Sequence, residues 1–179
     1  ALVCAKSLKF EDTVSLVNKR GNFMQNAVPI GVGKMVAISG LQREKVFEIV
    51  KESSDKGTIE CSNFNCPGQI IVSGHTAAVE KAAEIARESG ARGVTFLKVS
   101  APFHTSLLEG AGKNLRKELE KIEVGPTKLD FITNVTAKLV NKDDNIRELL
   151  ELHVSKAVLW EDTIDEMVKL GVDTFVEIG

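Results

Sequence analysis

The sequence contains no tyrosine, and aromatic residues make up only 5% of its 179 residues. Proteins that bind single-stranded nucleic acid stack bases on aromatic side chains, and proteins that bind duplexes carry a basic surplus. Here lysine and arginine number 23 and aspartate and glutamate 25, which gives a net charge of -2. The composition therefore argues against a nucleic-acid partner.

Cysteine and long apolar runs are also scarce. The three cysteines, Cys4, Cys61 and Cys66, form no C-x-x-C pair, so we expect neither a disulfide framework nor a zinc site. No apolar run approaches the roughly 20 residues that span a bilayer, and no signal-peptide pattern opens the chain. We therefore expect a cytoplasmic protein with reduced, buried thiols and no contact with a membrane.

What the sequence does contain is a regular alternation of strand and helix patterns between residues 30 and 99. Strands are predicted at 34–39, 58–64, 69–73 and 93–99, and helices at 41–54 and 76–89. Pro67-Gly68 supplies a tight turn between the two middle strands, which predicts a hairpin. The order β-α-β-β-α-β is that of a ferredoxin-like subdomain.

The flanking segments predict a second, larger α/β unit. Helices are predicted at 11–27, 105–122, 146–153 and from 160 to Gly171, and strands at 129–134 and 174–178. We therefore assign residues 1–29 and 100–179 to a large α/β subdomain and residues 30–99 to the small one. The chain opens within a helix pattern and closes directly after a core-type strand, so we expect a piece truncated at both ends.

No complete catalytic set is present. The sequence lacks G-x-S-x-G, a P-loop, a dinucleotide fingerprint and metal-ligand spacings. Of the three histidines, His75 is expected at the surface. His104 follows Pro102 in a loop before a helix, where α/β enzymes place catalytic groups. The same position also suits a histidine that only makes a local hydrogen bond, so both interpretations stay open.

Arg20 is the second candidate. It is predicted to share a helix face with Val14, Val17 and Met24. A guanidinium cannot lose its proton, so on an inward face it needs an anion. That anion is either a structural carboxylate of the chain or the carboxylate of a substrate.

Four stretches of the chain resemble malonyl-CoA:acyl-carrier-protein transacylases, in the family's order and spacing. They are RGNFMQNA at 20–27, NFNCPGQ at 63–69, VSAPFH at 99–104 and VLWE at 158–161. The resemblance implies an α/β-hydrolase-like acyltransferase core, incomplete in this chain, with an inserted ferredoxin-like subdomain. It implies transfer of a malonyl group from malonyl-CoA to the phosphopantetheine thiol of acyl carrier protein, without a metal or other cofactor.

The resemblance also implies roles for individual residues. Arg20 would bind the free carboxylate of malonate, and His104 would be the general base. Phe103 would shape the acyl pocket, and Met24 lies in the same substrate-binding stretch as Arg20. The backbone carbonyl of His153 would orient His104, at a position where the family usually has glutamine.

The family's nucleophilic serine lies in a G-x-S-x-G elbow that would precede Ala1. The chain would thus hold the base and the carboxylate clamp without the nucleophile or the oxyanion hole. Two alternatives stay open. One is a non-catalytic ferredoxin-like module that binds an acidic carrier protein through Arg92 and Lys98. The other is an acyltransferase for a different acyl group, which Arg20 and Phe103 disfavour.

Overall fold

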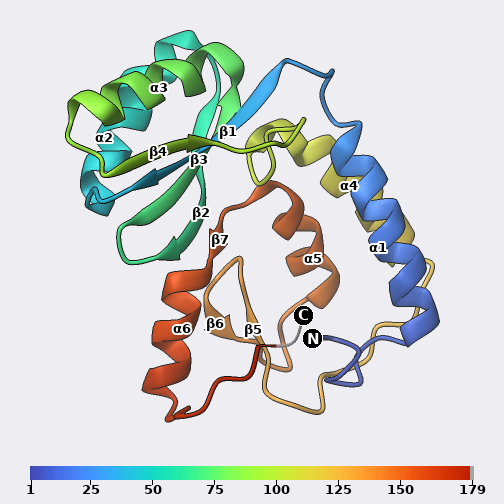
Figure 1. Ribbon diagram of the computed structural model, residues 1–179. Helices are drawn as coiled ribbons and strands as arrows, with labels where there is room; N and C mark the ends of the chain where they lie inside the picture. Colours follow the sequence, from blue (N-terminus) through green and yellow to red (C-terminus); the bar gives the residue numbers. More distant parts are fainter. Residues whose placement is uncertain (178–179) are drawn as a thin grey trace.

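The computed structural model describes residues 1–177 and contains one main sheet with the strand order β4-β1-β3-β2-β7 (Figure 1). Neighbouring strands among the first four are antiparallel, and β7 runs parallel to β2. The strands are β1 (Gly33–Ser39), β2 (Ile59–Cys66), β3 (Gln69–His75), β4 (Gly93–Phe96) and β7 (Val158–Leu159). The sheet therefore combines four strands from residues 33–96 with one strand from residues 158–159.

Two helices, α2 (Arg43–Ser53) and α3 (Thr76–Glu88), pack against this sheet (Figure 1). The inward face of α3 consists of alanines and one valine, all fully buried, and these small side chains let the helix approach the strands closely. They pack on Val36, Ile38 and Val72 from the strands. A short 3-10 turn, η1 (Ser54–Lys56), follows α2.

The remaining helices build a second core. α1 (Phe10–Gln25) lies along α4 (Glu109–Leu119), and α5 (Ile146–Ser155) packs against α4 (Figure 1). Leu16, Met24, Leu115, Leu119 and Val154 are buried between them. α6 (Trp160–Lys169) follows β7, a 3-10 turn η2 (Ser106–Leu108) precedes α4, and β5 (Ile132–Thr133) pairs with β6 (Lys138–Leu139) as a separate two-stranded sheet.

The strands and helices predicted between residues 34 and 99 are present in the predicted order, as is the first long helix. The predicted inward face of that helix is partly wrong. Val14 and Val17 are 54% and 59% exposed, whereas Met24 is buried as predicted and Leu16 is buried as well. The reason is that α4 covers the side of α1 that carries Leu16, and helical spacing alone cannot identify the covering partner.

Other predictions need correction. Residues 1–9 form turns instead of a helix, and the strand predicted at 129–134 is reduced to β5. Residues 174–177 form no strand, because a strand requires a pairing partner and none of the described segments pairs with them; Ile178 lies outside the described residues. Cys4 and Cys66 are exposed and Cys61 is half-buried. The prediction that the three thiols are buried is therefore wrong.

Within residues 1–177, no helix has the length and apolar character needed to cross a membrane. The same part of the chain contains no cluster of three or more histidine, cysteine, aspartate or glutamate side chains with the arrangement of a metal site.

Candidate active site

His104 lies in the loop between β4 and α4 and adopts a left-handed backbone conformation with φ of +59°. This conformation is uncommon for a residue other than glycine and costs of order 1 kcal/mol or more, so surrounding contacts must hold it. Thr105, which is fully buried, donates its hydroxyl to the Pro102 carbonyl at 2.7 Å. The Glu60 carboxylate, on β2, accepts the Ser106 backbone N–H at 3.1 Å. The loop is therefore fixed on both sides of His104.

Two backbone carbonyls hold the imidazole of His104. Its Nδ1 atom lies 3.0 Å from the carbonyl oxygen of His153 and 3.2 Å from that of Lys156. Because carbonyl oxygens only accept, Nδ1 carries the proton and donates it. The other ring nitrogen, Nε2, then carries the lone pair of the neutral ring. The geometry thus defines one tautomer with a basic nitrogen directed away from the carbonyls.

The surroundings favour the neutral form of this ring. Burial lowers the pKa of His104, and the positive charge of Arg20 lowers it further, while the hydrogen bonds to the His153 and Lys156 carbonyls raise it. The net direction is downward. His104 is therefore uncharged at neutral pH, the state in which a histidine can accept a proton.

The side chain of His153 is a neutral neighbour. Burial lowers the pKa of His153 to about 4, with smaller contributions from the charges of His104 and Arg20. His153 therefore acts on His104 through its backbone carbonyl, and its ring carries no charge near neutral pH.

Arg20 is half-buried on α1, and burial lowers the pKa of its guanidinium. Among residues 1–177, no aspartate or glutamate forms an ion pair with it. Of the two anions considered from the sequence, the structural carboxylate is thus not present in the described part of the chain. A partly buried cation without a counterion is suited to bind an anionic ligand.

Arg20 and His153 border the same cavity, which has a volume of about 590 Å³ and is otherwise mainly apolar. Val17 from α1, Leu149 from α5 and Trp160 from α6 also line it. The cavity therefore offers an apolar wall beside the Arg20 cation, and Asp130 is the acidic residue among its lining.

The other two predicted substrate-binding residues lie elsewhere. Met24 is 5% exposed and belongs to the core between α1 and α4. Phe103 is half-buried and packs against the same core. Neither residue borders the cavity that Arg20 lines. The structure thus brings Arg20, His104 and His153 together and leaves the roles of Met24 and Phe103 as predictions.

Three contributions to the site were missed from the sequence. The Lys156 carbonyl and the Glu60 carboxylate contact the ring or the loop of His104. Gly33 leaves space for Pro102, since a Cβ atom at Gly33 would lie 2.6 Å from the Pro102 Cγ. A backbone acceptor has no sequence signature, and the glycine was interpreted only as part of a turn. His75, expected at the surface, is half-buried and accepts the Thr58 N–H at Nδ1.

Comparison with known proteins places this site in a family. The model of the acyl transferase domain family matches residues 1–179. The chain belongs to the acyl transferase domain family. It is 38% identical over 180 residues to the malonyl CoA-acyl carrier protein transacylase of Bacillus subtilis, and the alignment covers 100% of the chain and 57% of that relative. Identity to the corresponding protein of Escherichia coli K12 is 37% over 179 residues, with 100% of the chain and 58% of that relative covered.

Solved structures give the same result. The malonyl CoA-acyl carrier protein transacylase from Clostridium perfringens superposes with a TM-score of 0.97 at 46% identity, covering 100% of this chain and 56% of that one. A complex of a type II polyketide acyl-carrier protein with its malonyl-transacylase superposes with a TM-score of 0.92 at 35% identity, covering 96% and 56%. The resemblance stated from sequence is confirmed, and the chain spans about 57% of the length of its relatives.

Proposed function

We propose that this chain is part of a malonyl-CoA:acyl-carrier-protein transacylase, in which His104 is the general base and Arg20 binds the malonate carboxylate. One observation carries the proposal. The Nδ1 atom of His104 is held by the carbonyls of His153 and Lys156, which leaves Nε2 as the basic nitrogen. Arg20 lies close enough for its charge to lower the pKa of both His104 and His153.

The proposed reaction has two steps with a covalent intermediate. In the first, Nε2 of His104 takes the proton of a serine hydroxyl in the part of the protein outside this chain. The serine oxygen bonds to the thioester carbon of malonyl-CoA, the carbon–sulfur bond breaks, and coenzyme A leaves with a proton from the imidazolium.

In the second step, His104 takes the proton of the phosphopantetheine thiol of acyl carrier protein. The sulfur bonds to the malonyl carbon, the ester bond breaks, and the serine recovers its proton from His104. Arg20 would hold the distal carboxylate through both steps, which keeps the reacting carbonyl in place. Because one thioester replaces another, the exchange needs neither a metal nor a redox cofactor.

The finer fold assignment belongs to the same proposal. The strand order β4-β1-β3-β2 with α2 and α3 packed against the strands supports a ferredoxin-like subdomain over residues 30–99. Residues 1–29 and 100–179 would then be parts of an α/β-hydrolase-like core. The exposed thiols of Cys4 and Cys66 suit a reducing compartment, so we propose the cytoplasm as its location.

The test is the His104→Ala variant of the whole protein. We expect the rate of malonyl-serine formation to fall at least about a hundredfold, as is common when a general base is removed, with binding of malonyl-CoA little changed. Rapid-quench intact mass measures the adduct, and His75→Gln is the matched control because His75 lies outside the site. A His104→Ala protein with near-normal transfer would contradict the proposal.

The same measurement separates the alternatives. A non-catalytic carrier-binding module predicts no malonyl adduct on the whole protein at all. An acyltransferase for a neutral acyl group predicts an adduct from acetyl-CoA that forms as fast as, or faster than, the one from malonyl-CoA.

A further inference from the structure

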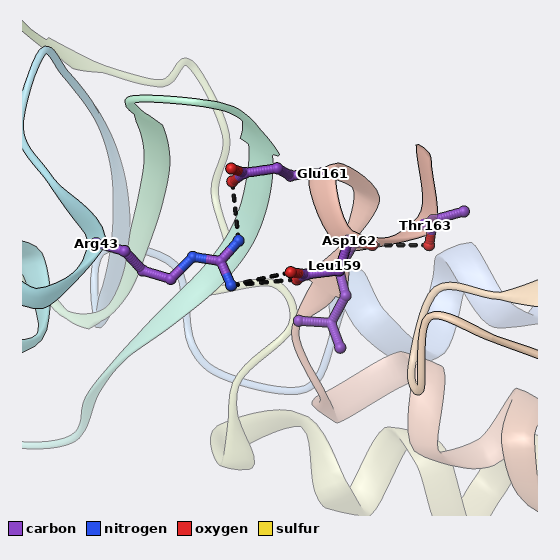
Figure 2. Close-up of polar contacts among 5 residues, drawn as sticks. All are labelled: Arg43, Leu159, Glu161, Asp162 and Thr163. Carbon is purple, nitrogen blue, oxygen red and sulfur yellow. Dashed lines mark hydrogen bonds and ion pairs between the residues drawn. The ribbon is translucent and has the colours of Figure 1, made fainter. Parts of the chain in front are cut away.

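Arg43, the first residue of α2, makes an ion pair with two consecutive carboxylates at the start of α6 (Figure 2). One terminal nitrogen of its guanidinium lies 2.8 Å from Glu161 Oε2. The other lies 3.1 and 3.3 Å from the two carboxylate oxygens of Asp162. The guanidinium carbon also lies 4.5 Å from the ring centroid of Phe64 on β2. Arg43 therefore joins the start of α2, strand β2 and the start of α6.

The residues just before Glu161 lead directly to His104. Lys156, whose carbonyl oxygen is one of the two acceptors for His104 Nδ1, lies two residues before the start of β7. β7 pairs with β2 through only two register positions, Asn63 with Val158 and Phe64 with Leu159. The Thr163 hydroxyl donates back to the Leu159 carbonyl at 2.7 Å (Figure 2). Segment 156–162 thus runs from the imidazole to the ion pair.

We propose that Arg43 is a positioning residue for His104: by holding Glu161 and Asp162 it fixes segment 156–162 and keeps the Lys156 carbonyl on Nδ1 of His104. This inference rests on the proposed function, since it assumes that His104 is the base. Arg43 itself touches neither substrate nor the reacting atoms.

The strength of the Arg43 contact supports a positioning role. An isolated surface ion pair contributes little to stability. Here the side chains of Arg43, Glu161 and Asp162 are 31%, 21% and 36% exposed, and the guanidinium binds both carboxylates while it stacks on an aromatic ring. β7 has only two pairing positions with β2, and the Leu159 N–H also donates to the Asn134 carbonyl at 2.9 Å. The ion pair adds a side-chain anchor immediately after this short strand.

The primary test is an NMR titration of the 179-residue chain, which has only three histidines, so the His104 ring can be assigned. In Arg43→Met we expect the titration midpoint of His104 to fall by about half a pH unit, because a hydrogen bond that stabilises the imidazolium is weakened. The charged or titratable side chains facing His104 are Arg20 from α1 and His153 from α5, and neither changes. If Arg43 acted on His104 through its charge alone, removing it would raise the His104 midpoint. The direction of the shift therefore distinguishes a positioning effect from a charge effect.

Arg43→Lys provides a second variant that conserves charge but cannot hold two carboxylates in a fork. It should lower the midpoint in the same direction by a smaller amount, and it decides the question if Arg43→Met does not fold. Arg87→Met is the matched control, because Arg87, on α3, also lies over a phenylalanine ring, that of Phe96, at 6.0 Å. Trp160, the only tryptophan, should show a red-shifted emission in the Arg43 variants alone.

In the whole protein, the Arg43 variants should shift the acid limb of the pH profile of kcat/KM to lower pH, by the same amount as the His104 titration midpoint. An unchanged or raised His104 midpoint in folded Arg43→Met and Arg43→Lys chains would overturn the inference. The proposed function fails separately, through near-normal transfer by His104→Ala. Loss of transfer in His104→Ala with unchanged Arg43 titrations would remove only the positioning role.

Discussion

The imidazole rings of His104 and His153 lie with their centroids 5.3 Å apart and their planes tilted by 34°. Two imidazolium ions at this separation would repel each other in a half-buried site, and Arg20 adds a third positive charge. The arrangement therefore keeps His153 neutral and lets His104 alone gain and lose a proton.

This pair predicts how stability depends on pH. The folded pKa of His153 is about 4, below its ordinary value of 6.5, and that of His104 is also lowered. Between pH 6.5 and 4 the unfolded chain binds more protons, so the free energy of unfolding falls as the pH falls through this window. We expect His153 to account for roughly 2 kcal/mol of the loss, with some reduction by solvent screening.

The measurement is denaturant unfolding at several pH values for the wild type and His153→Gln. The variant should lose less stability between pH 6.5 and 4, because glutamine does not titrate. Transfer by the whole protein should be nearly unchanged, because the backbone carbonyl that holds His104 remains. Equal pH dependence in both proteins would contradict the neutral state of His153.

Arg20→Ala should change the choice of acyl group. Loss of a charge-assisted hydrogen bond weakens binding about ten- to a hundredfold, so kcat/KM for malonyl-CoA should fall while acetyl-CoA is used relatively better. Arg20→Lys keeps the positive charge but cannot bind a carboxylate through two parallel N–H groups. Its preference for malonyl-CoA over acetyl-CoA should lie between those of the wild type and Arg20→Ala. The ratio of specificity constants for the two thioesters is the measurement, and an unchanged ratio in Arg20→Ala would leave Arg20 without a role in malonate binding.

Phe103→Ala should admit a bulkier acyl group. If Phe103 crowds the carbon between the two carbonyls, its truncation should raise the use of methylmalonyl-CoA relative to malonyl-CoA. Phe23 packs against the same core and is the matched control. Both variants should lose stability, because both remove apolar contacts, but only Phe103→Ala should change the ratio. A ratio that changes equally in both would assign the effect to loosened packing.

Gly33→Ala should disturb the loop that carries His104. The added Cβ would lie 2.6 Å from Cγ and 2.9 Å from Cβ of Pro102, two residues before the histidine. Since the proline ring cannot rotate away, we expect a loss of about 1–3 kcal/mol in stability and a lower transfer rate. Gly21→Ala, in α1 with no heavy atom within 4 Å of the new Cβ, should be neutral or stabilising. Equal melting temperatures for the two variants would contradict the clash.

The fold was predictable wherever the apolar residues recur at one regular spacing, helical or strand-like, or a turn motif is present. The alanines of α3 recur at helical spacing, and Pro67-Gly68 fixed the hairpin between β2 and β3, so this region follows from local sequence. Val14 and Val17 have the same apolar character as buried residues, yet their side of α1 is exposed. Burial depends on which surface covers a helix, and that surface comes from distant sequence.

The site divides in the same way. Arg20 and His104 were identified because their side chains carry the chemistry and lie in stretches that resemble a known family. Arg43 could not be found, because its partners Glu161 and Asp162 lie 118 and 119 positions away and nothing near it in sequence indicates them. The Lys156 carbonyl is a backbone group, which any residue could supply.

The parallel pairing of β7 with β2 also has a consequence for synthesis and solubility. Without β7, strand β2 would be an outer strand of the sheet, with unpaired N–H and C=O groups open to another chain. β7 covers part of that edge, at Asn63 and Phe64. During translation this part of the edge stays uncovered until residue 158 has left the ribosome. Until then, the backbone groups of β2 at Asn63 and Phe64 are open to pairing with another chain.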